Sequence, residues 1–253
     1  MILERLSPKG IDTSPYYVPN GIFNTSPPYS DVQMPNCTMY AFCRSYEICE
    51  AQERFDIARK GGGFGNAKDW YNESPLPKGS KLRVGSIAVF NGNYGHVAIV
   101  ERVVDSTHAL ISESQYDKDK SLRNYKYWQK RTVELVVGKA TLSGVGELLG
   151  FIYLPIKDIR TSRSDKEQIE ITEEYVNVRT SANGAIKAEG CYLPMGVYNV
   201  LNSKEADGYV WYKIDSKSWV REGSWLKHYA ANDEVGELKA DMKKIYEIIK
   251  RWL

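Results

Sequence analysis

Residues 82–104 read LRVGSIAVFNGNYGHVAIVERVV, and this stretch decides the fold of the N-terminal half. Two β-branched runs, 86–90 and 96–104, flank the turn NGNYG, and a third run, HALISES at 108–114, follows the turn DST. Short β-branched runs separated by turn residues predict a meander of antiparallel strands. Two further apolar runs are expected to complete the sheet, RTVELVV (131–137) and LLGFIYLP (148–155).

The segment before this sheet has the composition of a helix, NCTMYAFCRSYEIC. Asn36 is a good N-cap residue, which places Cys37 at the first helical position. A second, shorter helix is expected in NAKDWYNES at 66–74. Helices followed by an antiparallel sheet predict an α+β domain, which we expect to span residues 1–155.

Three side chains of this domain could hydrolyse an amide bond together. At a helix N-terminus, the dipole and the free N–H groups favour the thiolate of Cys37. His96 follows a glycine-rich turn that leaves room for a substrate. Glu113 and Gln115 share a strand face, so either could accept a hydrogen bond from His96 Nδ1. Each residue alone has an ordinary explanation, as a small core cysteine, a structural histidine or a solvated carboxylate. Their order along the chain is much more specific.

The stretches PNCTMYAFCR (35–44), LRVGSIAVFNGNYGHVAIVERV (82–103) and ISESQY (111–116) carry this order, and together they resemble the CHAP family. CHAP domains are cysteine, histidine-dependent amidohydrolases/peptidases. The segment GNAKDWY also looks like the helix that precedes the sheet in this family. The resemblance covers residues 15–155. It implies a papain-like fold and peptidoglycan hydrolysis of the kind found in phage endolysins and bacterial autolysins.

The resemblance also implies the roles of the site residues. Cys37 would be the nucleophile, His96 the general base and acid, and Glu113 the residue that orients His96. Gln115 stands where many members have an assisting Asn. Some phage members bind calcium through an Asp-rich loop before the nucleophile, but here that loop, PPYSDVQMPN, offers only Asp31. Calcium needs six to eight oxygen ligands, so neither a metal site nor a cofactor is predicted.

Residues 156–170 carry eight charged side chains and are predicted to form a linker. Short strands with regular turns then predict a small all-β barrel over 171–231. YVNVRTSANG (175–184) and YVWYKIDSKSWVREGSWL (209–226) resemble bacterial SH3-like domains, which implies a cell-wall-binding module with an aromatic groove.

Aromatic side chains in both domains are expected to bind the substrate. The residues predicted to do so are Trp70, Tyr94, Tyr116, Trp211, Tyr212 and Trp219; Tyr192, Tyr209 and Trp225 are further aromatic candidates in the second domain. For each aromatic residue of the barrel, packing in the core is the alternative. Because neighbouring strand residues point to opposite faces, at least one of Trp211 and Tyr212 is expected in the core.

The last segment, 232–253, predicts an amphipathic helix. Its apolar residues recur at steps of four and three: Leu238, Met242, Ile245, Ile249 and Trp252. This seam could pack on its own chain or pair with a second chain. Two short helices bury little surface, so any homodimer is expected to be weak.

Charge and composition exclude several classes of protein. The net charge of +2 does not favour nucleic acid or a membrane surface as a partner. No apolar run is long enough to span a membrane, and the N-terminus lacks the apolar core of a signal peptide. The four cysteines form no CxxC pair and are expected to be free thiols. We therefore expect synthesis in a host cytoplasm and a holin-type release to the cell wall.

Three functions remain open at this stage. The leading one is an endolysin-like peptidoglycan hydrolase that cuts an amide bond of the cell wall. The alternative is a non-catalytic wall-binding or structural protein on a CHAP fold. A third reading is a cytosolic cysteine peptidase that acts on proteins, against which the SH3-like segment argues. The sequence does not choose between the sugar-to-peptide amide and a peptide crossbridge.

Overall fold

The computed structural model describes residues 2–11, 13–17, 36–50, 57, 65–114, 128–142, 145–156, 160, 164 and 166–231. The chain forms two compact units. Unit 1 comprises residues 1–158 together with 188–192, and unit 2 comprises residues 159–187 together with 193–253. The predicted C-terminal helix at 232–253 lies outside the described residues, and so do Asp31, Gln115 and Tyr116. Within the described residues, no helix is both long and apolar enough to cross a bilayer.

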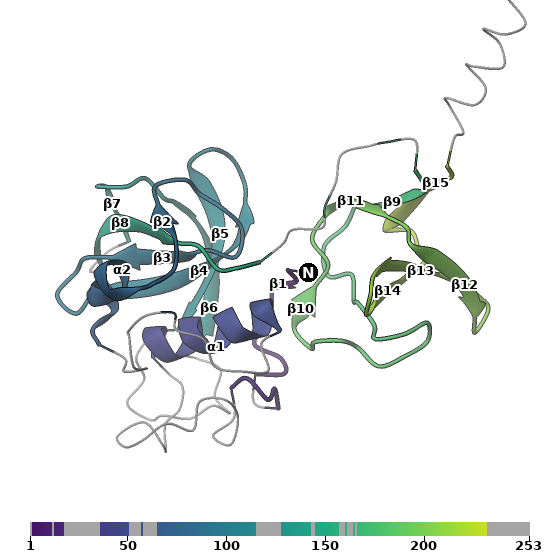
Figure 1. The fold of residues 1–253 in the computed structure, drawn as a ribbon, viewed down its shortest axis with the longest axis horizontal. Helices are drawn as coiled ribbons and strands as arrows, with labels where there is room; N and C mark the ends of the chain where they lie inside the picture. Colours follow the sequence, from purple (N-terminus) through teal and green to yellow (C-terminus); the bar gives the residue numbers. More distant parts are fainter. Residues whose placement is uncertain are drawn as a thin grey trace, which may run out of the picture. The chain divides into compact units, whose positions relative to one another are not determined.

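Unit 1 is built on one antiparallel sheet with the strand order β2-β8-β3-β4-β5-β6, and β7 pairs with β8 (Figure 1). The strands are β2 (Lys78–Gly79), β3 (Ile87–Phe90), β4 (His96–Val103), β5 (His108–Ser114), β6 (Trp128–Glu134), β7 (Ala140–Leu142) and β8 (Gly146–Ile152). The predicted meander is confirmed, because β3, β4, β5 and β6 are neighbours in both sequence and sheet. Strand β6 is shifted by three residues toward the N-terminus relative to the predicted run at 131–137.

The main helix of unit 1, α1 (Cys37–Cys49), packs against β4 and β5. Asn36 caps it, since its Oδ1 accepts a hydrogen bond from the backbone N–H of Thr38 at 2.9 Å. The predicted N-cap and the place of Cys37 at the first helical position are therefore confirmed. The second predicted helix is a 3₁₀ turn, η1 (Ala67–Asp69), that continues into α2 (Trp70–Glu73).

Apolar side chains fill both faces of the sheet. One cluster lies between the sheet and α1 and includes Val97 and Ile99, whereas the other contains Ala98, Val100 and Ile111. The two clusters alternate along β4 because successive strand residues point to opposite faces. His96, which begins β4, is therefore on the face of Ala98, and it lies beside Phe90 with ring centroids 6.0 Å apart.

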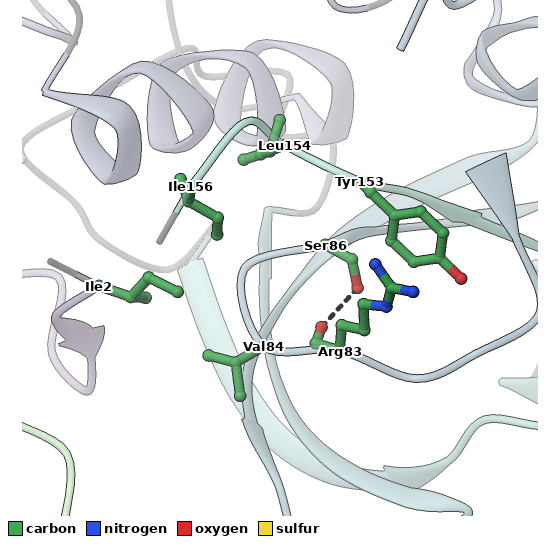
Figure 2. A pocket seen from close by; sticks show the side chains of 7 residues that line it. All are labelled: Ile2, Arg83, Val84, Ser86, Tyr153, Leu154 and Ile156. Carbon is green, nitrogen blue, oxygen red and sulfur yellow. Dashed lines mark hydrogen bonds between the residues drawn. The ribbon is translucent and has the colours of Figure 1, made fainter. Parts of the chain in front are cut away.

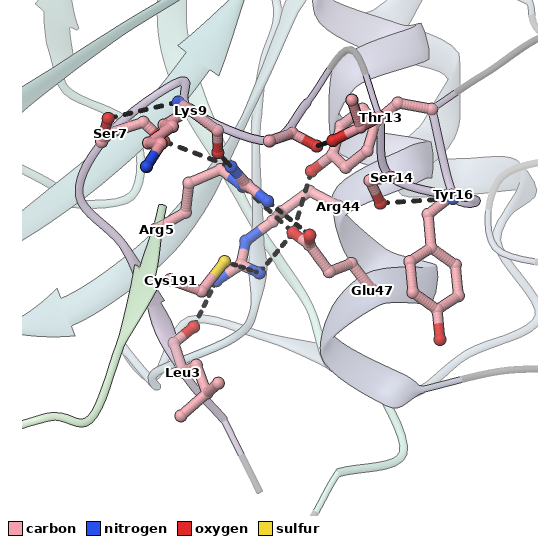
Figure 3. Close-up of polar contacts among 12 residues, drawn as sticks. Leu3, Arg5, Ser7, Lys9, Thr13, Ser14, Tyr16, Arg44, Glu47 and Cys191 are labelled. Carbon is pink, nitrogen blue, oxygen red and sulfur yellow. Dashed lines mark hydrogen bonds and ion pairs between the residues drawn. The ribbon is translucent and has the colours of Figure 1, made fainter. Parts of the chain in front are cut away.

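A buried network of charges fastens the N-terminal segment to α1 (Figure 3). Arg5 and Arg44 converge on Glu47, and Tyr17 donates its hydroxyl hydrogen to the same carboxylate. Burial alone would raise the pKa of Glu47, but the two guanidinium groups lower it to about 2. Arg44 also donates to Glu101 of β4, with 3.0 Å from Nε to Oε1 and 2.7 Å from Nη2 to Oε2.

A short strand from far along the chain completes unit 1. Strand β10 (Cys191–Tyr192) pairs with β1 (Glu4–Arg5), and Leu6 N donates to Gly190 O. The Cys191 thiol lies 3.5 Å from Arg44 Nη1, and burial raises the pKa of Cys191 to about 12. Unit 1 thus includes residues 188–192, which the sequence placed in the second domain.

The described part of unit 2 contains two three-stranded antiparallel sheets. The first has the order β11-β9-β15 and the second the order β12-β13-β14. The strands are β9 (Gln168–Ile171), β11 (Gly196–Asn199), β12 (Asn202–Ala206), β13 (Tyr209–Asp215), β14 (Ser218–Arg221) and β15 (Leu226–Tyr229). The described part of unit 2 is thus made of short strands, as predicted; its assignment to the SH3-like class stays a prediction.

The start of unit 2 differs from the prediction. Strand β9 begins at Gln168, inside the predicted linker, and its side chains of Ile169 and Ile171 are buried. Charged neighbours hide this short alternation in the sequence. The stretch 175–184, which resembles the start of SH3-like domains, makes only isolated bridges, at Val176 and Arg179. Tyr175 has a φ of 65°, which an extended strand cannot contain.

Candidate active site

Cys37 is the first residue of α1 and is half-buried. The backbone N–H groups of the first helical turn have no acceptor within the helix, and here Asn36 occupies the one at Thr38. An anion at the helix N-terminus is stabilised by these groups and by the helix dipole. Cys37 thus lies at the end of α1 where its free backbone N–H groups are, and its role as nucleophile stays a prediction.

A tight turn places His96 at the start of β4. Gly95 in this turn has a φ of +74°, and a Cβ there would lie 2.2 Å from the backbone N of Lys68. Only glycine fits this approach. Lys68 also donates from Nζ to Asn93 O at 2.9 Å. These contacts with Lys68, in the segment before α2, fix the turn, and the turn in turn places His96 at the start of β4.

His96 and Glu113 form a buried pair. The distance from His96 Nε2 to Glu113 Oε2 is 2.5 Å, and the two residues are 8% and 0% exposed. The expectation that Nδ1 would face the carboxylate is wrong, because Nε2 occupies this place. Cys37 is close enough to His96 to raise the pKa of the imidazole. The imidazole therefore interacts with both the thiol and the carboxylate.

The charges of this pair follow from its surroundings. Burial alone would lower the pKa of His96, but hydrogen bonds with Cys37 and Glu113 raise it to about 9. Burial would raise the pKa of Glu113, yet the hydrogen bonds and charges of His96 and Arg131 hold it below its ordinary value. At neutral pH the pair is thus an imidazolium and a carboxylate.

Two residues of the site were not predicted from the sequence. Glu113 Oε1 accepts hydrogen bonds from Gln129 Nε2 at 2.7 Å and from Arg131 Nε at 2.6 Å. Both donors belong to β6, where Gln129 is directly opposite Glu113. The alternation of β6 against β5 could have revealed them, if the register of the two strands had been known. The predicted assisting amide, Gln115, lies outside the described residues.

The predicted substrate-binding residues of unit 1 have different environments. Tyr94 is 72% exposed in the turn before His96, so its ring is available to a substrate. Trp70 is fully buried in the core cluster beneath α1. It has no surface for a substrate to touch, so the prediction for Trp70 is wrong. The ring packs among the apolar side chains of this cluster instead. Tyr116 is not among the described residues.

The predicted aromatic groove of unit 2 also needs correction. Trp211 and Tyr212 are both almost fully buried, and Trp219 is half-buried. A pocket of about 290 Å³ has Trp211 in its wall. Its other lining residues are Glu173, Glu174, Tyr175, Val176, Asn177, Arg179, Arg221 and Trp225. Trp225, one of the further candidates, carries an indole N–H that is buried without a hydrogen-bond partner.

A second pocket, of about 240 Å³, lies in unit 1 at the beginning of β3 (Figure 2). It is lined by Ile2, Arg83, Val84, Ser86, Tyr153, Leu154 and Ile156. The guanidinium of Arg83 lies 4.2 Å from the centre of the Tyr153 ring. None of its lining residues belongs to the Cys37–His96–Glu113 site. Within the described residues, no group of three or more His, Cys, Asp or Glu side chains could hold a metal ion.

Comparison with known proteins identifies part of this unit. Residues 28–115, about a third of the chain, match the family model of the CHAP domain, and this range contains Cys37, His96 and Glu113. The chain is also similar to the crystal structure of Ly7917, with 19% identity, a TM-score of 0.33, and coverage of 77% of this chain and 88% of that chain. The chain is likewise similar to the crystal structure of Ly7917 with the hydrolyzing product of MDP, with 18% identity, a TM-score of 0.32, and coverage of 76% of this chain and 84% of that chain. TM-scores this low do not establish a shared fold.

Proposed function

We propose that this protein is a peptidoglycan hydrolase of the endolysin type, which cleaves an amide bond of the bacterial cell wall through Cys37. The observation that carries the proposal is the buried His96–Glu113 pair, whose imidazole interacts with the cysteine at the N-terminus of α1. A nucleophile, a base and a group that orients the base are the parts that covalent amide hydrolysis requires. The CHAP match over residues 28–115 supports the choice of peptidoglycan as substrate.

The reaction follows from these positions. The Cys37 thiolate attacks the carbonyl carbon of the amide, and the backbone N–H of Cys37 stabilises the oxyanion that forms. The imidazolium of His96 gives its proton to the leaving amine, and the C–N bond breaks. An acyl-enzyme remains. Water then attacks it, with neutral His96 taking a proton from the water, and the thiolate leaves as the product acid forms.

Glu113 holds the imidazole during both steps. Its carboxylate fixes which nitrogen carries the hydrogen toward β5, and it stabilises the imidazolium that donates the proton. Tyr94 is the described aromatic residue that we assign to substrate binding, because its exposed ring lies two residues before His96. Gln115 and Tyr116 stay predictions for the same site.

The alternative, a non-catalytic protein on a CHAP fold, would not need the charges of this site. A buried imidazolium–carboxylate pair costs desolvation, and a protein that only binds would be as stable with apolar side chains there. The presence of a nucleophile, a base and a group that orients the base therefore favours an enzyme. A peptidase that acts on cytosolic proteins is the third candidate, and the pocket of unit 2 argues against it.

We further propose that unit 2 holds the enzyme on the wall through the pocket beside Trp211. Arg221 lies over the rings of Tyr209 and Trp225, at 4.3 and 5.8 Å, and Arg179 lies 5.8 Å from the ring of Trp211. Glu173 and Glu174 add negative charge to the rim. Aromatic and charged groups of both signs in one pocket suit a wall peptide, which carries amide, amino and carboxylate groups. No nucleic acid, membrane or cofactor is part of this proposal, and release to the wall is assigned to a holin-type route.

The function is tested by the clearing of a suspension of Gram-positive cells. The full chain is compared with Cys37→Ala and with Cys49→Ala, a matched control that removes the same thiol at the other end of α1. We expect wild type and Cys49→Ala to clear the suspension and Cys37→Ala to leave it turbid. Clearing by Cys37→Ala at a substantial rate would refute the mechanism. Binding to walls without clearing by wild type would favour the non-catalytic alternative.

A further inference from the structure

Glu113 divides its two oxygen atoms between two different partners. Oε2 faces His96, whereas Oε1 accepts from Gln129 Nε2 at 2.7 Å and from Arg131 Nε at 2.6 Å. Both donors come from β6, beyond the range of the CHAP match. Gln129 pairs with Glu113, and Arg131 pairs with Ile111, so all these side chains lie on one face of the two strands.

We propose that Gln129 and Arg131 are positioning residues, a carboxylate clamp that turns Glu113 so that Oε2 alone reaches His96 and the imidazole presents its other nitrogen to Cys37. The inference rests on the function proposed above, because it assigns these two residues a part in that same reaction. Neither residue touches the reacting atoms. Both act through Glu113.

The clamp fixes the orientation of the carboxylate. The terminal torsion of a glutamate is broad, so a single hydrogen bond would leave the carboxylate plane free to turn. Two donors on Oε1, from neighbouring positions of a paired strand, define that plane. Since a displacement of about 1 Å can cost 10²-fold in rate, a group that holds the imidazole needs such support.

The clamp also fixes the charge of the carboxylate. Gln129 and Arg131 offer only N–H donors to Oε1, and a proton on that oxygen would face these donors instead of an acceptor. Among the described residues, the charged groups that act on Glu113 are the imidazolium of His96 on β4 and the guanidinium of Arg131 on β6, and Cys37 on α1 interacts with the imidazole. An ionised Glu113 in turn keeps the proton on His96.

The two donors differ in kind. The Arg131 side chain is 40% exposed, so water screens much of its charge, and its fixed N–H geometry remains. Gln129 is neutral and contributes geometry alone. Removing Arg131 should therefore change both the orientation and the charge of the site, whereas removing Gln129 should change mainly the orientation.

The test uses the full chain and needs no substrate. Arg131→Gln, Arg131→Lys and Gln129→Ala are compared with Lys139→Gln, a control that also removes a cation paired with a glutamate, at 2.6 Å from Glu134. Two quantities are measured against pH: the protonation of the His96 imidazole by NMR, and the rate at which iodoacetamide modifies Cys37, assigned by peptide mass spectrometry.

We expect Arg131→Gln to slow the alkylation of Cys37 near neutrality. It should also raise the pH at which His96 loses its proton by about half a unit or more, because it removes a cation beside the pair while Glu113 stays ionised. Arg131→Lys should bring the titration midpoint of His96 most of the way back to the wild-type value. It should restore the alkylation rate of Cys37 less completely, because lysine keeps the charge without the planar donor. On cell walls, Arg131→Gln and Gln129→Ala should lower kcat by about 10- to 100-fold at an unchanged KM. The control should match wild type in every measurement.

An unchanged His96 midpoint and an unchanged alkylation rate in Arg131→Gln would overturn the proposal. If Arg131→Gln does not fold, as judged by circular dichroism, Gln129→Ala decides: wild-type alkylation of Cys37 in this variant overturns the clamp. A shifted midpoint in a protein that never cleaves walls would support the clamp while refuting the proposed function. The two conclusions therefore stand or fall separately.

Discussion

His96 and Glu113 meet through Nε2 and Oε2 at a distance of 2.5 Å, in a part of unit 1 from which water is almost excluded. This contact determines the state of the site. It keeps the carboxylate charged and the imidazole protonated. The first prediction removes one partner of this contact.

Glu113→Gln should lower kcat for wall hydrolysis by roughly 10³- to 10⁴-fold, because the amide supplies neither the charge nor the defined acceptor that orients His96. The rate is measured by cell clearing at several protein concentrations. Gln115→Ala, a change two residues away, should have a milder effect. The reverse ranking of the two variants would make Gln115 the orienting residue.

The stability of unit 1 should depend on pH through His96. Its folded pKa of about 9 lies above the ordinary value of 6.5, so the folded state binds the proton more tightly than the unfolded state. This contribution is fully present below pH 6.5 and is lost as the pH rises through 9. Thermal unfolding of wild type and His96→Gln should therefore converge between pH 6.5 and 9. A constant difference across this window would contradict the assigned charge.

Arg44→Met should destabilise unit 1 by about 3–5 kcal/mol. The substitution leaves Glu101, which has no exposed surface, without its two hydrogen bonds from the Arg44 side chain. Urea unfolding gives the free energy. Lys139→Met, which breaks an exposed ion pair with Glu134, is the control and should cost no more than about 1 kcal/mol. Equal losses for both variants would show that the buried network is unimportant.

Removal of metal ions should leave the protein unchanged. The loop that precedes Cys37, where some CHAP members bind calcium, has a single acid, Asp31. Within the described residues, no cluster of acids, histidines and cysteines could hold a metal ion. EDTA should therefore alter neither the clearing of cells nor the melting temperature of the chain. A loss that added calcium restores would show that ligands have been overlooked.

The sequence predicts the centre of unit 1 well because its signals there are local. Asn36 caps the helix that it was expected to cap, and the β-branched runs around the turn at 91–95 form β3 and β4. His96 and Glu113 follow from these elements, because they are at the beginning and the end of adjacent strands. A capping residue and a period of two are properties of a few neighbouring residues.

The features that could not be predicted from the sequence depend on contacts between residues that are distant along the chain. Strand β10 has two residues and pairs with β1 across some 190 positions, so no local pattern could reveal it. Gln129 becomes part of the site only through the register of β6 against β5. Trp70 and Trp211 were expected to bind substrate, but the volume available in each core decides whether such rings are buried.

The central claim is that Cys37 cleaves an amide bond of peptidoglycan. Its most direct test is mass spectrometry of the fragments released from purified cell walls by the full chain and by Cys37→Ala. We predict that wild type releases fragments with new amine and carboxylate ends at one kind of amide bond, and that Cys37→Ala releases none of them. Identical fragments from both proteins, or fragments cut at a glycosidic bond, would contradict the account.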